Sequence, residues 1–121
     1  MSARQFRFED LEIWRKAADF SGSLFQMADK LDEKRKYRFA EQLRAAALSI
    51  TNNIAEGSGS TSDADFANYL NMSRRSVFEV ANILIILSRE NYLEPREITP
   101  ILNELEEESR MLLAFMRTLR S

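Results

Sequence analysis

Acidic side chains are the residues of this chain whose type and spacing could support catalysis. They gather at three places: Glu9 and Glu12, then Asp29 and Asp32, and finally Glu104, Glu107 and Glu108. Carboxylates brought together in this way bind magnesium in some all-α nucleotide hydrolases. The run from Glu106 to Glu108, however, is more typical of a solvated helix face. A Mg-dependent nucleotide hydrolase is therefore one interpretation, and a set of surface charges is the favoured one.

Other common kinds of active site are excluded by residue types that the sequence lacks. It has no Cys and no His, which removes disulfides, thiolate nucleophiles, the usual proton shuttle near neutral pH and the commonest nitrogen ligand for metals. The Gly-rich stretch Gly57–Ser58–Gly59 lacks the Lys of a phosphate-binding loop. We therefore expect no enzymatic activity, no metal and no cofactor.

Basic residues could bind the phosphates of a nucleic acid. The candidate contacts are Lys34, Arg35, Lys36, Arg38, Arg44, Arg74 and Arg75. Tyr37 and Phe39 interleave the first four and could stack on bases. The acidic neighbours Asp32 and Glu33 would weaken the positive field, and a solvated helix start needs no ligand. Structured RNA or another nucleic acid is thus the leading partner, and a solvated charge run is the alternative.

A polar stripe runs beside an apolar one between residues 42 and 57. Leu43, Ala47, Ile50 and Ile54 recur at helical spacing, and the polar residues Gln42, Ser49, Asn53 and Glu56 follow the same rhythm. Ser76 and Glu79 on the next helix could complete the set, with Arg38 or Arg44 as a basic partner for Glu56. We expect a structural hydrogen-bond network, with a ligand or metal pocket as the alternative.

The elements that must position these residues are helices. The chain has 121 residues, 45% hydrophobic and 30% charged, with three Gly and two Pro, which favours one all-α domain over residues 1–121. Periodicity predicts helices over residues 10–30, 34–56, 62–91 and 97–119. Asp10 and Ser62 are the expected N-caps, Gly57 is expected to end the second helix, and the fourth should begin between Pro95 and Pro100. Short connections imply an up-down-up-down antiparallel four-helix bundle.

The sequence also predicts where the protein resides. Its most apolar stretch, Ile83 to Leu87, is far shorter than the ~20 residues that span a bilayer, and the first residues lack a signal-peptide apolar run. We expect a cytoplasmic protein that does not enter a membrane. The net charge of -2 argues against a generic nucleic-acid coat.

The outer side of the third predicted helix points to self-association. Nearly opposite the inward-facing Val80 and Leu84, it carries Phe78, Asn82, Ile85 and Arg89. Aromatic and Arg side chains together are common in protein interfaces, and a helix that is apolar all round usually buries more than one face. We expect a homo-oligomer, whereas scattered surface apolar residues are the alternative.

Three sequence blocks resemble the family of four-helix bundle proteins, or 23S rRNA-intervening sequence proteins. The first is Phe8-x-Asp10-Leu11-x-x-Trp14-x-x-Ala17. The second is Gln42-Leu43-x-x-Ala46-x-x-Ser49-Ile50-x-x-Asn53-Ile54-Ala55-Glu56-Gly57. The third combines Phe66-x-x-Tyr69-Leu70 with Ser76-x-x-Glu79. Together they span nearly the whole chain.

The resemblance implies a small cytoplasmic helical bundle that forms a pentameric ring. Its architecture is similar to that of the accessory protein of diversity-generating retroelements, a basic pentamer that binds nucleic acid and a reverse transcriptase. Two positions depart from the family pattern. Arg44-Ala45 stands where relatives often carry two basic residues, and Arg74-Arg75 precedes Ser76 where a small residue is usual.

The sequence therefore predicts a non-enzymatic, homo-oligomeric scaffold or adaptor, pentameric by resemblance, that binds structured RNA or another nucleic acid. A protein–protein interaction module without nucleic-acid binding is the alternative, and the Mg-dependent hydrolase comes third.

Overall fold

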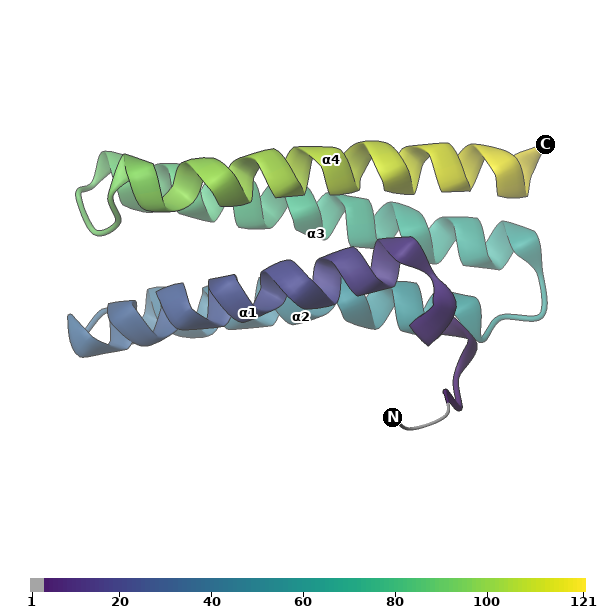
Figure 1. Ribbon diagram of the computed structural model, residues 1–121, viewed down its shortest axis with the longest axis horizontal. Coiled ribbons are helices and arrows are strands. Elements are labelled where there is room, and N and C mark those ends of the chain that lie inside the picture. Colours follow the sequence, from purple (N-terminus) through teal and green to yellow (C-terminus); the bar gives the residue numbers. More distant parts are fainter. Residues whose placement is uncertain (1–3) are drawn as a thin grey trace.

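The computed structural model describes residues 4–121, and its ordered elements are all helical. A short 3₁₀-helix, η1 (Arg7–Asp10), precedes α1 (Glu12–Glu33), α2 (Tyr37–Ser58), α3 (Asp63–Arg89) and α4 (Pro95–Arg120). Successive helices run in opposite directions along one long axis (Figure 1). The predicted all-α four-helix bundle is confirmed. Over residues 4–121, no helix has an apolar stretch long enough to cross a membrane.

The core is built from residues that recur at helical spacing along each helix. In α1 the buried stripe comprises Ile13, Ala17, Phe20, Leu24, Met27 and Leu31. In α3 it comprises Phe66, Leu70, Ser73, Val77, Val80, Leu84 and Leu87. A second row of apolar side chains, which includes Leu11, Trp14 and Phe25, widens the apolar face of α1. These side chains are half-buried against the same core. One continuous core therefore joins all four helices.

Helix α1 begins later than expected because a different local structure precedes it. Asp10 is not its N-cap: that residue is Leu11, which has no side-chain capping bond. Residues around Asp10 form η1, in which the Glu9 carboxylate accepts a hydrogen bond from the backbone N–H of Phe6 (3.0 Å). Asp10 instead pairs with Arg4 at 2.6 Å.

The predicted bounds of α2 and α3 are corrected by two turns at one end of the bundle. Arg35 and Asn91 both have left-handed backbones, with φ of 62° and 66°. The N–H of Lys36 bonds to Leu31 O (2.8 Å), and that of Tyr92 to Leu87 O (2.9 Å), which are the closing bonds of Schellman motifs. These turns end α1 and α3, so α2 starts at Tyr37 rather than residue 34, and α3 stops at Arg89 rather than residue 91.

Gly57 does not end α2, because the helix continues to Ser58 and its C-cap is Gly59. Gly57 is needed for close packing: an added Cβ would lie 2.6 Å from Tyr69 Cβ and 2.9 Å from Phe66 Cδ1. The predicted cap of α3 is confirmed, since Ser62 Oγ accepts from the N–H of Asp65 at 3.1 Å.

The start of the fourth helix shows how proline is tolerated. Pro95 is the first residue of α4, two residues before the predicted bound, and Pro100 lies inside the helix. Pro95 costs nothing because the first N–H groups of a helix have no partner within it. Pro100 lies in the second turn, where it removes one backbone bond.

The four helices meet in four seams, and α1–α4 is the seam with the fewest contacts.

Candidate functional site

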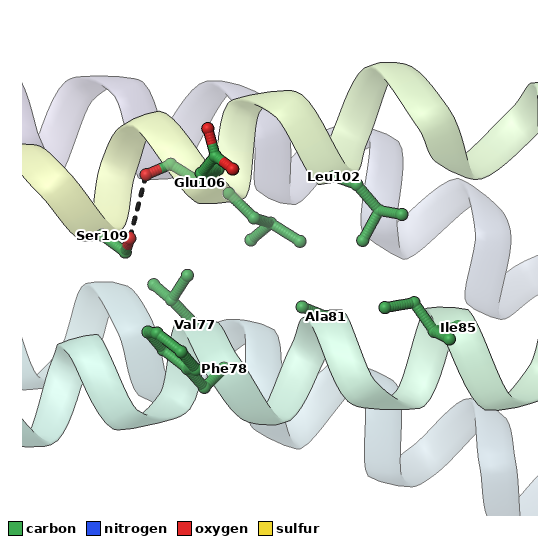
Figure 2. A pocket seen from close by; sticks show the side chains of 8 residues that line it. Val77, Phe78, Ala81, Ile85, Leu102, Glu106 and Ser109 are labelled. Atoms are coloured by element: carbon green, nitrogen blue, oxygen red, sulfur yellow. Dashed lines mark hydrogen bonds between the residues drawn. The ribbon is translucent and has the colours of Figure 1, made fainter.

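An apolar groove lies between α3 and α4. It has a volume of about 320 Å³ and is lined by Val77, Phe78, Ala81, Ile85, Leu102, Leu105, Glu106 and Ser109. Figure 2 shows Val77 and Leu102 pointing from their helices toward the space between them. The only dashed bond there joins Ser109 Oγ to Glu106 O within α4, at 2.9 Å. The groove thus offers shape and apolar surface, and no reactive constellation.

The residues predicted for the oligomer interface lie along the rim of this groove and on the adjoining face of α3. Phe78 is 57% exposed and Ile85 is 43% exposed, which is high for such large apolar side chains. Asn82 and Arg89 are exposed on the same helix. The guanidinium of Arg74 lies 5.2 Å from the ring centre of Phe78, while its Nε donates to Ser109 O at 3.1 Å. Phe78 therefore contacts Arg74 while more than half of its surface stays open to solvent.

Three of the six residues predicted for a polar network form one between α2 and α3. Ser76 Oγ donates to Met72 O at 3.2 Å, so the 2.7 Å bond between the two hydroxyls must use the proton of Ser49. Asn53 Nδ2 donates in turn to Ser49 Oγ (3.1 Å) and Ser49 O (2.8 Å). The resulting chain runs in one direction, Asn53 to Ser49 to Ser76 to Met72 O. Its hydroxyl protons are all used within the bundle, which supports a structural role.

The other three predicted members stay outside that chain. Gln42, Glu56 and Glu79 are exposed, and among the described residues none of them makes a side-chain hydrogen bond or ion pair. Glu79 does line a hollow of about 410 Å³ that also contains Arg75 and the network residues. Glu56 does not pair with Arg44, because both Asp29 and Asp32 hold that guanidinium at 2.6 Å.

The seven basic residues predicted to contact phosphate are distributed over three parts of the surface. Lys34, Arg35, Lys36 and Arg38 lie at the α1–α2 turn, Arg44 is on α2 facing α1, and Arg74 and Arg75 are in the middle of α3. The bonds from Asp32 and Asp29 raise the pKa of Arg44 and neutralise its charge locally. Arg74 keeps its charge, but its half-buried side chain lies on α3 against Ser109 and Phe78, away from the turn. Four of the seven basic residues therefore lie close together at the α1–α2 turn, whereas Arg75 is exposed on α3.

Tyr92, which the sequence did not single out, completes this end of the bundle. Lys34 Nζ donates to Tyr92 O (2.7 Å), and Lys36 Nζ lies 4.4 Å from the centre of the Tyr92 ring. The ring of Phe39 lies 5.9 Å from that of Tyr92, and Tyr37 is 56% exposed. We call Lys34, Lys36, Tyr37, Phe39 and Tyr92 the aromatic-basic end. Tyr92 joins it because the α1–α2 and α3–α4 turns lie at the same end of the molecule (Figure 1).

Glu108 is the residue that sequence reasoning misread. The run Glu106–Glu108 predicts a solvated face, yet Glu108 is 0% exposed, while Glu106 and Glu107 are exposed. Neither of its carboxyl oxygens has a hydrogen-bond partner among residues 4–121. Burial raises its pKa to about 8. The spacing Leu105–Glu108–Leu112, which places Glu108 in the core stripe of α4, was the available signal.

The acidic groups considered for magnesium are not assembled into a site. Glu104 and Glu107 both contact Lys16 Nζ, at 2.5 and 3.5 Å, and Asp29 and Asp32 bind Arg44. Across the part of the chain that the structure describes, no group of three acidic side chains could hold a metal ion.

Comparisons with known proteins place the chain in a family. Its fold is similar to the crystal structure of a protein of unknown function from the S23 ribosomal protein family of Bacteroides thetaiotaomicron, with a TM-score of 0.82 and 25% sequence identity. The alignment covers 86% of this chain and 97% of that protein. No curated protein matches the chain. The family model for the 23S rRNA-intervening sequence protein matches residues 9–114. The chain therefore belongs to the 23S rRNA-intervening sequence protein family, as its three sequence blocks suggested.

Proposed function

We propose that this protein is a non-enzymatic scaffold that assembles with copies of itself and recruits RNA. The observation that carries the proposal is the exposure of Phe78 and Ile85 beside the α3–α4 groove. Exposed aromatic and aliphatic groups arranged along a concave apolar surface are typical of a protein interface.

A second copy of the chain is the occupant that this surface fits best. Charges of both signs surround the groove and the outer face of α3, with Arg75 and Arg89 balanced by Glu79 and Glu106. A surface with balanced charge can pack against another copy without net repulsion. The family resemblance favours a ring of five, in which each protomer uses one surface to meet the next.

The aromatic-basic end supports RNA as the second partner. Its lysines are held in place by Tyr92, and exposed aromatic rings beside them suit stacking with unpaired bases. Assembly would repeat this small positive surface several times around one particle, so that weak contacts add through avidity. A protein-interaction module without RNA is the second candidate, favoured by the net charge of -2 and by the neutralisation of Arg44.

Native mass spectrometry of protein purified with and without nuclease treatment tests the assembly. We expect a pentamer of the 14.0 kDa chain and a monomer for Phe78→Ser. The matched control is Leu48→Ser, which removes an apolar side chain 47% exposed on α2, outside the groove. A wild-type monomer would contradict the scaffold. Dissociation by Leu48→Ser alone would move the interface to α2.

Fluorescence anisotropy with a labelled RNA stem-loop tests the second partner. The Lys34→Gln, Lys36→Gln double variant should bind more weakly, and its slope of log affinity against log salt should fall by about 2 because two phosphate contacts are lost. Arg44→Gln is the control and should bind normally, since its charge is already paired with Asp29 and Asp32. No RNA binding at low salt would favour the protein-interaction module.

A further inference from the structure

Glu108 lies on the side of α4 that faces α1, between Glu104, which pairs with Lys16, and Met111, which lines a hollow with Ile13. Glu108 is wholly buried, and both of its oxygens lack a hydrogen-bond partner among the described residues. A buried ionised carboxylate without a partner is strongly disfavoured, so the group keeps its proton. Burial raises the pKa of Glu108 to about 8, Lys16 acts in the opposite direction, and Glu107 adds to the rise.

The charged groups near Glu108 are committed to other bonds. From α1, Lys16 donates to Glu104 and contacts Glu107 rather than Glu108. From α3, Arg74 reaches α4 next to Glu108 but donates to the backbone oxygen of Ser109. The buried positions of α2 are apolar or small residues and offer no charge. As far as the described helices are concerned, ionised Glu108 would therefore need water or a rearrangement of the seam to stabilise it.

The backbones of α1 and α4 approach each other at fewer places than those of any other pair of adjacent helices. A hollow lies at either end of this seam. The hollow near the start of α1 has a volume of about 420 Å³ and includes Ile13, Met111 and Phe115. The one near the end of α1 has about 300 Å³ and includes Met27, Pro100 and Ile101. Water thus needs to cross only the central part of the seam to reach Glu108.

We infer that Glu108 is a proton-controlled latch: the α1–α4 seam stays closed while the carboxyl holds its proton and opens to admit water when the proton leaves. The latch is independent of self-assembly and of RNA binding. The protonation of Glu108 is also not obscured by that of other side chains near neutral pH. The sequence has no His and no Cys, the side chains that ordinarily titrate there.

The expected size of the effect follows from linkage. An open seam exposes a carboxyl whose ordinary pKa is 4.5, while the closed seam holds it at about 8. The opening equilibrium should therefore rise about tenfold per pH unit between these values and level off above the higher one. From pH 6 to pH 8 the rise should reach about 50-fold.

Thiol labelling measures this opening directly, because any introduced Cys is the sole thiol of the chain. Ala17→Cys places the thiol on the buried side of α1, next to Lys16, and Ala47→Cys places it in the buried face of α2. Both alanines are 0% exposed. Each labelling rate is divided by that of a free thiol at the same pH, which removes the titration of the thiol itself.

We expect Ala17→Cys to label at least about tenfold faster than Ala47→Cys at pH 8 and to show the rise given above. Adding Glu108→Gln should abolish that rise, and Glu108→Met serves the same purpose if the amide variant folds poorly. Equal rates at the two sites would mean that whole-chain unfolding exposes both, which overturns the latch. Faster labelling at Ala17→Cys without pH dependence, or with a dependence that survives Glu108→Gln, would overturn it as well.

Discussion

The α2–α3 and α1–α4 seams both bring polar side chains into the bundle, and they differ in whether those side chains find partners. At α2–α3, Ser73 Oγ donates to Ile50 O at 2.8 Å, and Ser49 and Ser76 bond to each other. At α1–α4, Glu108 is buried and has no hydrogen-bond partner within residues 4–121. Small hydroxyls reach partners within a close-packed seam, whereas a long carboxyl in an apolar layer cannot.

The two seams also differ in how closely their helices approach. Gly57 lets α2 pack directly on the Tyr69 and Phe66 side chains of α3. The α1–α4 seam instead carries its main polar contacts at the edge, as ion pairs from Lys16 to Glu104 and from Lys30 to Glu97. Each of these pairs has one side chain open to solvent, and ion pairs that water reaches contribute little stability. The α2–α3 seam should therefore hold the fold, while α1–α4 is free to respond to conditions.

The largest effect that would sharpen this contrast is expected for Glu108→Met. The folded chain holds a proton on Glu108 that the unfolded chain releases above pH 4.5, so stability falls as the pH rises to about 8 and then levels off. Removing the carboxyl should stabilise the protein by about 3 kcal/mol at pH 7, and by less at pH 5. Thermal melts across this range measure the gain.

The matched control for that variant is Glu107→Met, which removes the neighbouring carboxylate of α4. Glu107 is exposed and contacts Lys16 at 3.5 Å, so its loss should change stability by less than about 1 kcal/mol. If both variants melted alike, or if Glu108→Met were destabilising at pH 7, the assignment of Glu108 as a buried, unpartnered group would be refuted.

At the tight seam, Gly57→Ala should destabilise the fold by about 2 kcal/mol. Ala favours a helix over Gly by about 1 kcal/mol, but the new Cβ would lie within 3.0 Å of both Tyr69 and Phe66, and overpacking of this kind costs roughly 3 kcal/mol. Gly22→Ala is the control, because nothing lies within 4 Å of its added Cβ. It should stabilise α1 by roughly 1 kcal/mol. Denaturant titrations that gave both variants the same sign would contradict the close approach of α2 and α3.

Periodicity was sufficient to predict the helices, because every inward position of α1 and α3 is apolar or small at regular spacing. The residues at which the helices begin and end were harder to predict from the sequence. Arg35 adopts a left-handed turn usually made by Gly, so it carries no sequence signal. Asn91 is of a type that tolerates this conformation, and it marks the end of α3 to within two residues. Gly57 carried a misleading one, since a Gly near a helix end resembles a C-cap, whereas its role here depends on Tyr69 in another helix.

The site was predictable only where helical spacing and antiparallel pairing suffice. Ser49, Asn53 and Ser76 met as expected, because their stripes face one another across adjacent helices. The basic residues did not form one surface, since Asp29 and Asp32 capture Arg44 and Ser109 captures Arg74. Such competition between partners depends on side-chain positions in three dimensions, which one sequence does not reveal.

A smaller effect is expected at the hydroxyl chain of α2–α3. Ser76→Ala should cost about 1 kcal/mol, because the half-buried hydroxyl of Ser49 loses its acceptor. The double variant Ser49→Ala, Ser76→Ala should cost less than the sum of the two single changes, because it removes both hydroxyls and leaves neither of them without its partner. Thr118→Ala, in an exposed position where the hydroxyl bonds only within α4, is the control. Strict additivity in the cycle would show that the two hydroxyls do not depend on each other.

The smallest change in stability, with the most specific pH signature, should come from Lys16→Met. The edge ion pairs of Lys16 should contribute less than about 1 kcal/mol. Its positive charge, however, lowers the pKa of Glu108, so its loss should raise that pKa and move the point where stability levels off to higher pH. Lys30→Met, which breaks the equivalent edge pair with Glu97, should leave that point in place. If the two lysine variants gave the same pH profile, Lys16 would not sense the Glu108 carboxyl, and the two ends of the α1–α4 seam would be equivalent.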